Sequence, residues 1–90
     1  MKKAEVLLWI LRICEKMKLS KKVSQIAMEL LFSNEDIIKN HKPKTVAGAL
    51  IHIASKLAGE GRSQVEISRE AGISEVSLRN VVKEVNIFKK

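Results

Sequence analysis

Residues 63–85, SQVEISREAGISEVSLRNVVKEV, hold the polar side chains whose spacing best suits a chemical task. Arg79, Asn80 and Lys83 fall on one side of a segment with helical periodicity. A guanidinium can donate two parallel hydrogen bonds to a guanine edge, and amide and ammonium groups can donate to bases or phosphates. These residues therefore predict recognition of DNA, an interaction in which no covalent bond is made or broken.

Val76 falls on the same side as these polar residues, and in a major groove it can rest on a thymine methyl group. The alternative is a partly covered surface valine, since single exposed apolar residues are common. For Arg79 the alternative is a solvated charge. Glu66, Glu70 and Glu75 oppose DNA contact because carboxylates repel phosphate. We expect them to point away from the duplex or to accept a hydrogen bond from a cytosine.

The segment also carries the local signals of a helix-turn-helix spanning residues 63–86. Ser63 and Glu66 form an S-x-x-E capping box at the start of a first helix. Gly72 follows, where glycine adopts a left-handed backbone at little cost, and Ser74 is a good cap for a second helix. The apolar residues expected to face inward are Val65, Ile67, Ala71, Ile73, Leu78, Val81, Val82 and Val85.

Composition sets the limits on the class of protein. The chain of 90 residues makes one small domain, and its 46% of hydrophobic residues favours a folded state. A net charge of +7, from 17 basic and 10 acidic residues, favours a polyanionic partner. The charge is spread, with +4 in residues 1–42, +1 in residues 43–61 and +2 in residues 62–90. Basicity thus supports contact with DNA without pointing to the helix-turn-helix.

The sequence offers little for catalysis or metal binding. Cys14 is the single cysteine, which excludes an internal disulfide and a cysteine-rich zinc site, and its apolar neighbours predict a buried, unreactive thiol. His41 and His52 have no partners at metal-ligand spacing, and His52 is expected to be packed or half-exposed. Neither a paired base and nucleophile nor a glycine-rich phosphate loop occurs. We expect no enzyme activity, no cofactor, no metal and no small-molecule substrate.

The first residues, MKKAEVLLWILRIC, place two lysines before an apolar run, as a secretion signal does. Glu5 and Arg12 interrupt the run, and no cleavage site of small residues follows, which argues against export. No stretch approaches the length of a membrane span. The expected setting is the cytoplasm, in association with the nucleoid, or the nucleus if the chain is eukaryotic.

Helical periodicity extends along the whole chain and strand signals are weak, which predicts an all-α fold of five helices. The first helix is expected over residues 4–18, with Trp9 anchoring a contact to a neighbouring helix or another domain. The second begins after the cap Ser20 and ends near Ile38. Pro43 then opens a third helix that is apolar on nearly all sides and forms the buried centre. In the first two helices the residues expected to face inward are Val6, Leu7, Ile10, Leu11, Ile13, Cys14, Met17, Val23, Ile26, Ala27, Leu30 and Leu31.

Three motifs follow one another between Pro43 and Val85: a proline-led, alanine-rich helix ending in IAS, an SQ-x-E segment, and the helix SEVSLRN. In this order, and without a gap, they resemble the second cyclin-like repeat of the general transcription initiation factor B of archaea and eukaryotes. The first 40 residues match more loosely, as two amphipathic helices. The matching residues are Pro43, Ile53-Ala54-Ser55, Ser63-Gln64 with Glu66, and Ser74-Glu75-Val76-Ser77-Leu78-Arg79-Asn80.

The resemblance implies a five-helix cyclin-like bundle whose last two helices form the helix-turn-helix. It also implies binding to double-stranded promoter DNA next to the TATA element, together with the TATA-box-binding protein, and indirect recruitment of RNA polymerase. Val76 and Arg79 match the family's base-contacting pair. Residues at the ends of such helices bind phosphate. The complete set of candidate DNA-binding residues is Gln64, Ser74, Val76, Ser77, Arg79, Asn80 and Lys83.

The chain departs from the family's pattern in several places. Lys42 stands where a serine usually caps the third helix, and Val81 and Val82 replace a basic and an aromatic residue of many relatives. The family's zinc ribbon and first repeat have no counterpart here, as expected of either an excised domain or a shorter stand-alone relative. Two other functions stay open. One is a stand-alone helix-turn-helix regulator, expected to be a dimer because one short helix reads few bases. The other is a cyclin-like protein-interaction module in which the motif is only structural.

Overall fold

The computed structural model describes residues 2–85, and over this range the chain is helical without a strand. The all-α class predicted from the periodicity is therefore confirmed. Residue 86, the predicted end of the helix-turn-helix, lies outside the described residues. The elements, in order, are α1 (Lys2–Lys16), α2 (Lys21–Ser33), the 3-10 helix η1 (Glu35–Lys39), α3 (Pro43–Leu57), α4 (Gln64–Ala71) and α5 (Glu75–Glu84).

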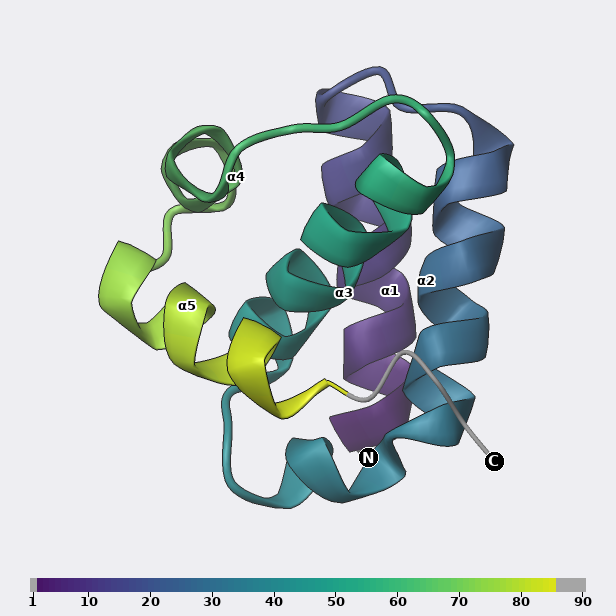
Figure 1. Ribbon diagram of the computed structural model, residues 1–90. Helices are drawn as coiled ribbons and strands as arrows, with labels where there is room; N and C mark the ends of the chain where they lie inside the picture. Colours follow the sequence, from purple (N-terminus) through teal and green to yellow (C-terminus); the bar gives the residue numbers. More distant parts are fainter. Residues whose placement is uncertain (1, 86–90) are drawn as a thin grey trace.

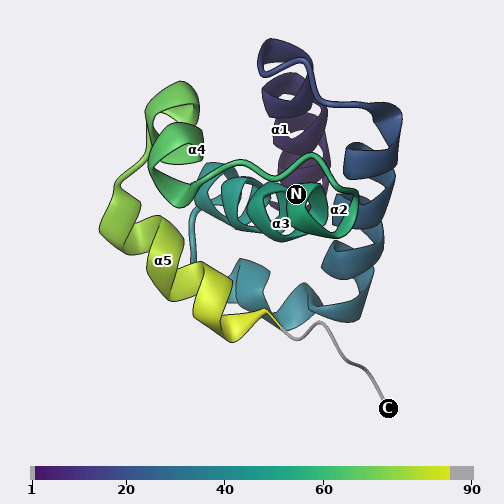
Figure 2. The same cartoon turned by 45° about the horizontal axis from the view of Figure 1, so that its top comes forward.

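Helix α3 runs through the middle of the molecule, with α1 and α2 on one side and α4 and α5 on the other (Figure 1, Figure 2). Every residue from Thr45 to Ser55 is buried, which confirms the predicted buried centre. A Cβ added at Gly48 would lie 2.9 Å from Cδ1 of Ile73, so this glycine lets the corner between α4 and α5 approach α3 closely. The helix-turn-helix is thus seated directly on the core.

Helices α1 and α2 bury narrower faces than their periodicity predicts. Leu11, predicted inside, is 49% exposed, and Leu7, Met17 and Ile26 are only partly buried. The prediction for Leu11 is wrong because both helices lie at the outside of the bundle, where α3 covers them from one side (Figure 2). Leu7, Met17 and Ile26 pack against the core as predicted, although each keeps part of its surface exposed. Helix α1 also begins and ends two residues earlier than predicted, at Lys2 and Lys16.

Helix α2 ends at Ser33, well before the predicted end near Ile38. Asn34 stops it, because its backbone N–H donates to the carbonyl of Leu31 at 3.0 Å and its side-chain amide donates to that of Leu30 at 2.8 Å. An asparagine side chain that bonds the last carbonyls offers the backbone an alternative to further helix. The chain then turns into η1, so the predicted extension of α2 is wrong.

Ser20 occupies the N-cap position of α2, but its side chain does not cap the helix as predicted. Its hydroxyl donates instead to the carboxylate of Glu60, and its N–H donates to the same group at 3.0 Å. These two bonds hold the pKa of Glu60 below the usual value of a glutamate. The start of α2 is thereby tied to the segment that leads from α3 to α4.

Candidate nucleic-acid interface

Capped helix ends and a left-handed glycine build the turn between α4 and α5. Ser63 Oγ accepts a hydrogen bond from the N–H of Glu66 at 3.0 Å, which caps α4. At the other end Gly72 has φ 69° and ψ 40°, the left-handed backbone that glycine adopts easily. Ser74 Oγ then accepts from the N–H of Ser77 at 3.3 Å and caps α5. The helix-turn-helix predicted from these residues is confirmed.

Two details of α4 differ from the prediction. Val65, predicted inside, is 45% exposed, because the eight-residue helix meets the core only through the side that carries Ile67 and Ala71. The carboxylate of Glu66 does not return to the N–H of Ser63 as a complete capping box requires. It lies 3.6 Å from Nε of Arg62 instead.

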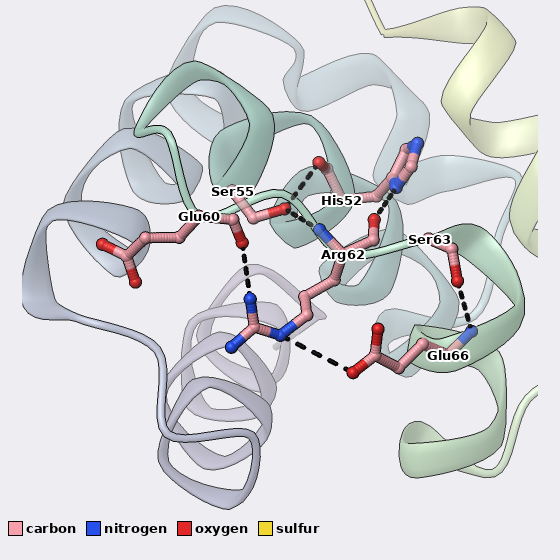
Figure 3. Close-up of polar contacts among 6 residues, drawn as sticks. All are labelled: His52, Ser55, Glu60, Arg62, Ser63 and Glu66. Atoms are coloured by element: carbon pink, nitrogen blue, oxygen red, sulfur yellow. Dashed lines mark hydrogen bonds and ion pairs between the residues drawn. The ribbon is translucent and has the colours of Figure 1, made fainter.

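Arg62 fixes the linker between α3 and α4 through a cluster of polar contacts (Figure 3). Its backbone N–H donates to Ser55 Oγ at 3.2 Å, and its carbonyl lies 2.8 Å from Nδ1 of His52. Its side chain donates to the carbonyl of Glu60 at 2.8 Å and pairs with Glu66. Because the N–H and the carbonyl of Arg62 both bond side chains of α3, the start of α4 has a defined position relative to α3.

His52 belongs to this cluster as a packed side chain and is 5% exposed. Burial lowers the pKa of His52 below its usual value, and the charge of Lys56 lowers it further, against the opposing effect of the hydrogen bond to Arg62. The ring is therefore neutral at pH 7, and its Nδ1 carries the proton, since a carbonyl can only accept. The predicted packed role of His52 is confirmed.

Helix α5 separates an apolar side from a polar side. Leu78 and Val81 are fully buried, Val85 is 9% exposed, and Val82 is partly buried against the core. The opposite side is open to solvent, and there Val76 is 60% exposed. The candidate residues that share this exposed side are Val76, Arg79, Asn80 and Lys83.

The other candidate residues lie at the start of the two helices. Ser74 and Ser77 are exposed at the first turn of α5. Gln64, the first residue of α4, is partly buried and lines a shallow pocket with Lys56 and Val82 on the other flank of α5. The structure therefore places hydroxyl and amide groups on both flanks of the exposed side of α5.

The three carboxylates that oppose DNA binding are each paired with a cation. Glu75 accepts from Nη2 of Arg79 at 3.3 Å, one helical turn apart. Glu70 lies 3.8 Å from Nζ of Lys16, and Glu66 pairs with Arg62 as described above. Pairing reduces the repulsion that these groups would exert on phosphate.

The set predicted from the sequence lacks Lys42 and Lys44, which lie beside the first turn of α5 in the same pocket as Ser74 and Ser77. Nζ of Lys44 also lies 4.7 Å from the centroid of the Trp9 ring, which gives Trp9 its contact with a neighbouring helix. The segment KPK around Pro43 is the only sequence signal for this cation pair. Their nearness to α5 depends on the tertiary fold, so helical spacing within residues 63–85 could not reveal it.

Within residues 2–85 no group of three or more histidine, cysteine, aspartate or glutamate side chains is placed to hold a metal ion. None of the helices described is both long enough and apolar enough to cross a membrane.

Comparison with known proteins gives the chain its relatives. The family described as transcription factor TFIIB repeat matches residues 3–87. Transcription initiation factor IIB 1 of Thermoplasma volcanium is 39% identical over 79 residues, which cover 86% of this chain and 25% of that protein. Transcription initiation factor IIB of Pyrobaculum islandicum is 37% identical over 84 residues, covering 91% and 25%. The same factor of Archaeoglobus fulgidus is 37% identical over 79 residues, covering 86% and 24%.

The chain thus spans about a quarter of the length of these relatives, which are named as transcription initiation factors and not as enzymes. The family match extends over nearly all of the five-helix bundle, from α1 to beyond α5. It confirms the resemblance seen in the sequence motifs and, with it, the cyclin-like all-α fold. This chain belongs to the family of transcription factor TFIIB repeats.

Proposed function

We propose that this chain binds promoter DNA with α5 in the major groove beside the TATA element, as the second cyclin-like repeat of its family. The observation that carries the proposal is the exposed side of α5, where Val76, Arg79, Asn80 and Lys83 stand clear of the core. Nothing in the buried stripe of α5 has to move to present this side.

The dimensions of α5 suit a major groove. Its 10 residues make a rod that is about 15 Å long, and a major groove about 12 Å wide admits such a helix. Arg79 is proposed to bind a guanine edge, and Val76 to rest on a thymine methyl group. Asn80 adds a donor and an acceptor for base edges, and Lys83 binds phosphate. The flanking phosphate contacts come from Gln64, Ser74 and Ser77.

The partners of the proposal follow from the family. Relatives named as transcription initiation factors support a role with the TATA-box-binding protein at the promoter, and through that complex an indirect role in recruiting RNA polymerase. The proposed place of action is therefore at the DNA, in the nucleoid-associated cytoplasm or in a nucleus. No small-molecule substrate and no membrane are part of this role.

A gel-shift assay on TATA-promoter DNA, with and without the TATA-box-binding protein, tests the proposal. We expect weak binding by the chain alone. When both proteins are present, we expect a complex that migrates more slowly than that of the DNA with the TATA-box-binding protein alone. Equally tight, sequence-specific binding without the TATA-box-binding protein would favour a stand-alone helix-turn-helix regulator. If the chain neither binds the DNA alone nor adds to the complex of the DNA with the TATA-box-binding protein, the result would favour a protein-interaction module. A promoter with a scrambled sequence upstream of the TATA element serves as the control.

A further inference from the structure

A pocket of about 460 Å³ lies between the first turns of α3 and α5. We propose that this pocket holds one backbone phosphate of the bound duplex, an inference that rests on the DNA-binding function proposed above. Its lining includes Lys42, Lys44, Thr45 and Ser77, whose groups carry the inference.

The pocket is cationic. Its lining includes no carboxylate. Lys42 and Lys44 form no ion pair with any residue between 2 and 85. Glu84 lies 3.1 Å from Nε2 of His41, so a charge on His41 is balanced at the edge of the pocket. The two lysines therefore supply its net positive potential. The ring of Trp9 restrains the side chain of Lys44 through a cation–π contact.

The first turn of α3 adds backbone donors. Lys42 makes no side-chain cap, and Pro43 has no N–H. The first backbone bond of the helix runs from the N–H of Val46 to the carbonyl of Lys42 at 3.0 Å. The N–H groups of Lys44 and Thr45 come earlier in the helix and have no intrahelical acceptor. Helix ends of this kind bind anions through such N–H groups.

Thr45 points independently to a ligand. Its side chain is 6% exposed, and its hydroxyl forms no hydrogen bond with the described part of the chain, although groups buried to this degree are normally bonded. No fully enclosed polar side-chain atom in that part lacks a partner, so the Thr45 oxygen retains contact with solvent. Since Thr45 lines the pocket, its hydroxyl can bond an oxygen of a bound phosphate in place of solvent.

The place of the pocket selects a DNA phosphate over a free anion. A helix in the major groove has a strand backbone along each flank. Ser77 lines the pocket and lies one turn before Asn80, on the edge of the exposed side of α5. A duplex that receives the exposed side of α5 therefore brings one strand's backbone to the mouth of the pocket.

Substitutions in the full chain test this assignment by quantitative DNA binding at several salt concentrations. Lys44→Gln should weaken binding about three- to tenfold and reduce the salt dependence by about one counterion, with base preference unchanged. Thr45→Val should weaken binding by a similar factor without altering the salt dependence, because it removes a donor and no charge. Lys21→Gln, on the first turn of α2 away from α5, is the matched control and should change neither quantity.

Single methylphosphonate substitutions along the DNA identify the phosphate itself. At one position the neutral group should weaken binding by the wild-type chain, and have little further effect on Lys44→Gln, since the two changes remove the same contact. If every methylphosphonate weakens binding by the same factor in the wild-type chain and in Lys44→Gln, the pocket does not hold a DNA phosphate. DNA binding by α5 would still stand. If the wild-type chain does not join the complex of promoter DNA with the TATA-box-binding protein, the proposed function itself fails. Unchanged melting temperatures in both variants exclude loss of fold as the cause.

Discussion

An exposed ion pair positions the side chain of Arg79 on the surface of α5. Its guanidinium donates to Glu75 at 3.3 Å, and its side chain remains 49% exposed. Exposed ion pairs one helical turn apart contribute less than about 1 kcal/mol, so a guanine edge can replace this contact at little cost. The pair keeps the long side chain on one part of the helix surface, which reduces the rotamer entropy lost on binding. The buried side chains of Cys14 and His52 provide direct tests of the fold at the scale of single residues.

Cys14 is predicted to be unreactive in the folded protein. Burial, together with the negative charge of Glu60, raises the pKa of this thiol to about 11, and the side chain is 4% exposed. A disulfide reagent such as DTNB, applied near neutral pH, should label native protein only as fast as the chain unfolds, because the thiolate is the reactive form. The same protein in denaturant should react at once. Fast labelling without denaturant would contradict the burial of α1 against α3.

His52 should make stability depend on pH. Its folded-state pKa lies below the unfolded value of 6.5, so the unfolded chain binds the proton more readily. The free energy of unfolding is then greatest above the unfolded pKa and decreases as pH falls below it. Denaturant titrations between about pH 7 and about pH 5 should show this decrease, and His52→Asn should lessen it, since asparagine can donate to the Arg62 carbonyl without titrating. An equal decrease in both proteins would rule out His52 as the cause.

At the scale of elements, local signals and tertiary contacts differ in how far they can be predicted. The caps Ser63 and Ser74 and the left-handed Gly72 are fixed by neighbours in sequence, so the turn is predictable. The end of α2 is not, because the amide of Asn34 competes with a helical pattern that continues past it. Ser20 likewise bonds Glu60, a partner 40 residues away. Periodicity alone gives no information about such distant partners.

Gly72 is the element-scale test of the turn. Gly72→Ala should lower the free energy of unfolding by about 1 kcal/mol, since the left-handed conformation costs alanine about 1–2 kcal/mol and reduced entropy of the unfolded chain offsets part of this. Gly61→Ala is the matched control, because the added Cβ would lie at 3.5 Å from Cγ of Lys56, an ordinary contact. The control should be neutral or slightly stabilising. Equal losses in both variants, measured by denaturant unfolding, would show that the left-handed turn is not the source of the cost.

At the scale of the whole molecule, the bundle uses α3 to place residues that are distant in sequence on one surface. The exposed side of α5 was predictable because a single helical period defines it. The phosphate pocket was not, since it joins the start of α3 to the start of α5. The second flank, with Gln64 and Val82, also forms only when the linker fixed by Arg62 brings the start of α4 beside α3. Helix type is a local property, whereas the width of a buried face and the binding surfaces between elements depend on the tertiary fold.

The charge distribution of the molecule predicts weak, salt-dependent DNA binding by the chain alone. The 17 basic residues are spread along the chain, and among residues 2–85 few of them lie around α5. Lys42 and Lys44 line the pocket beside its first turn, and Arg79 and Lys83 lie on its exposed side. Each neutralised phosphate contributes about −0.9 to the slope of log affinity against log salt concentration, which gives a slope of about −2 to −4. Binding isotherms over a range of salt concentrations measure it. A slope near zero would exclude phosphate contact.

The base preference of Arg79→Ala, compared with that of Arg69→Ala, tests the central role of α5 most directly. Both arginines are exposed within the helix-turn-helix, but Arg69 lies on α4. In the complex with the TATA-box-binding protein, binding to promoter libraries randomised upstream of the TATA element should show that Arg79→Ala loses about 1–3 kcal/mol and the preference at one base pair. Arg69→Ala should retain that preference. If Arg79→Ala binds with unchanged affinity and unchanged base preference, α5 does not read the groove.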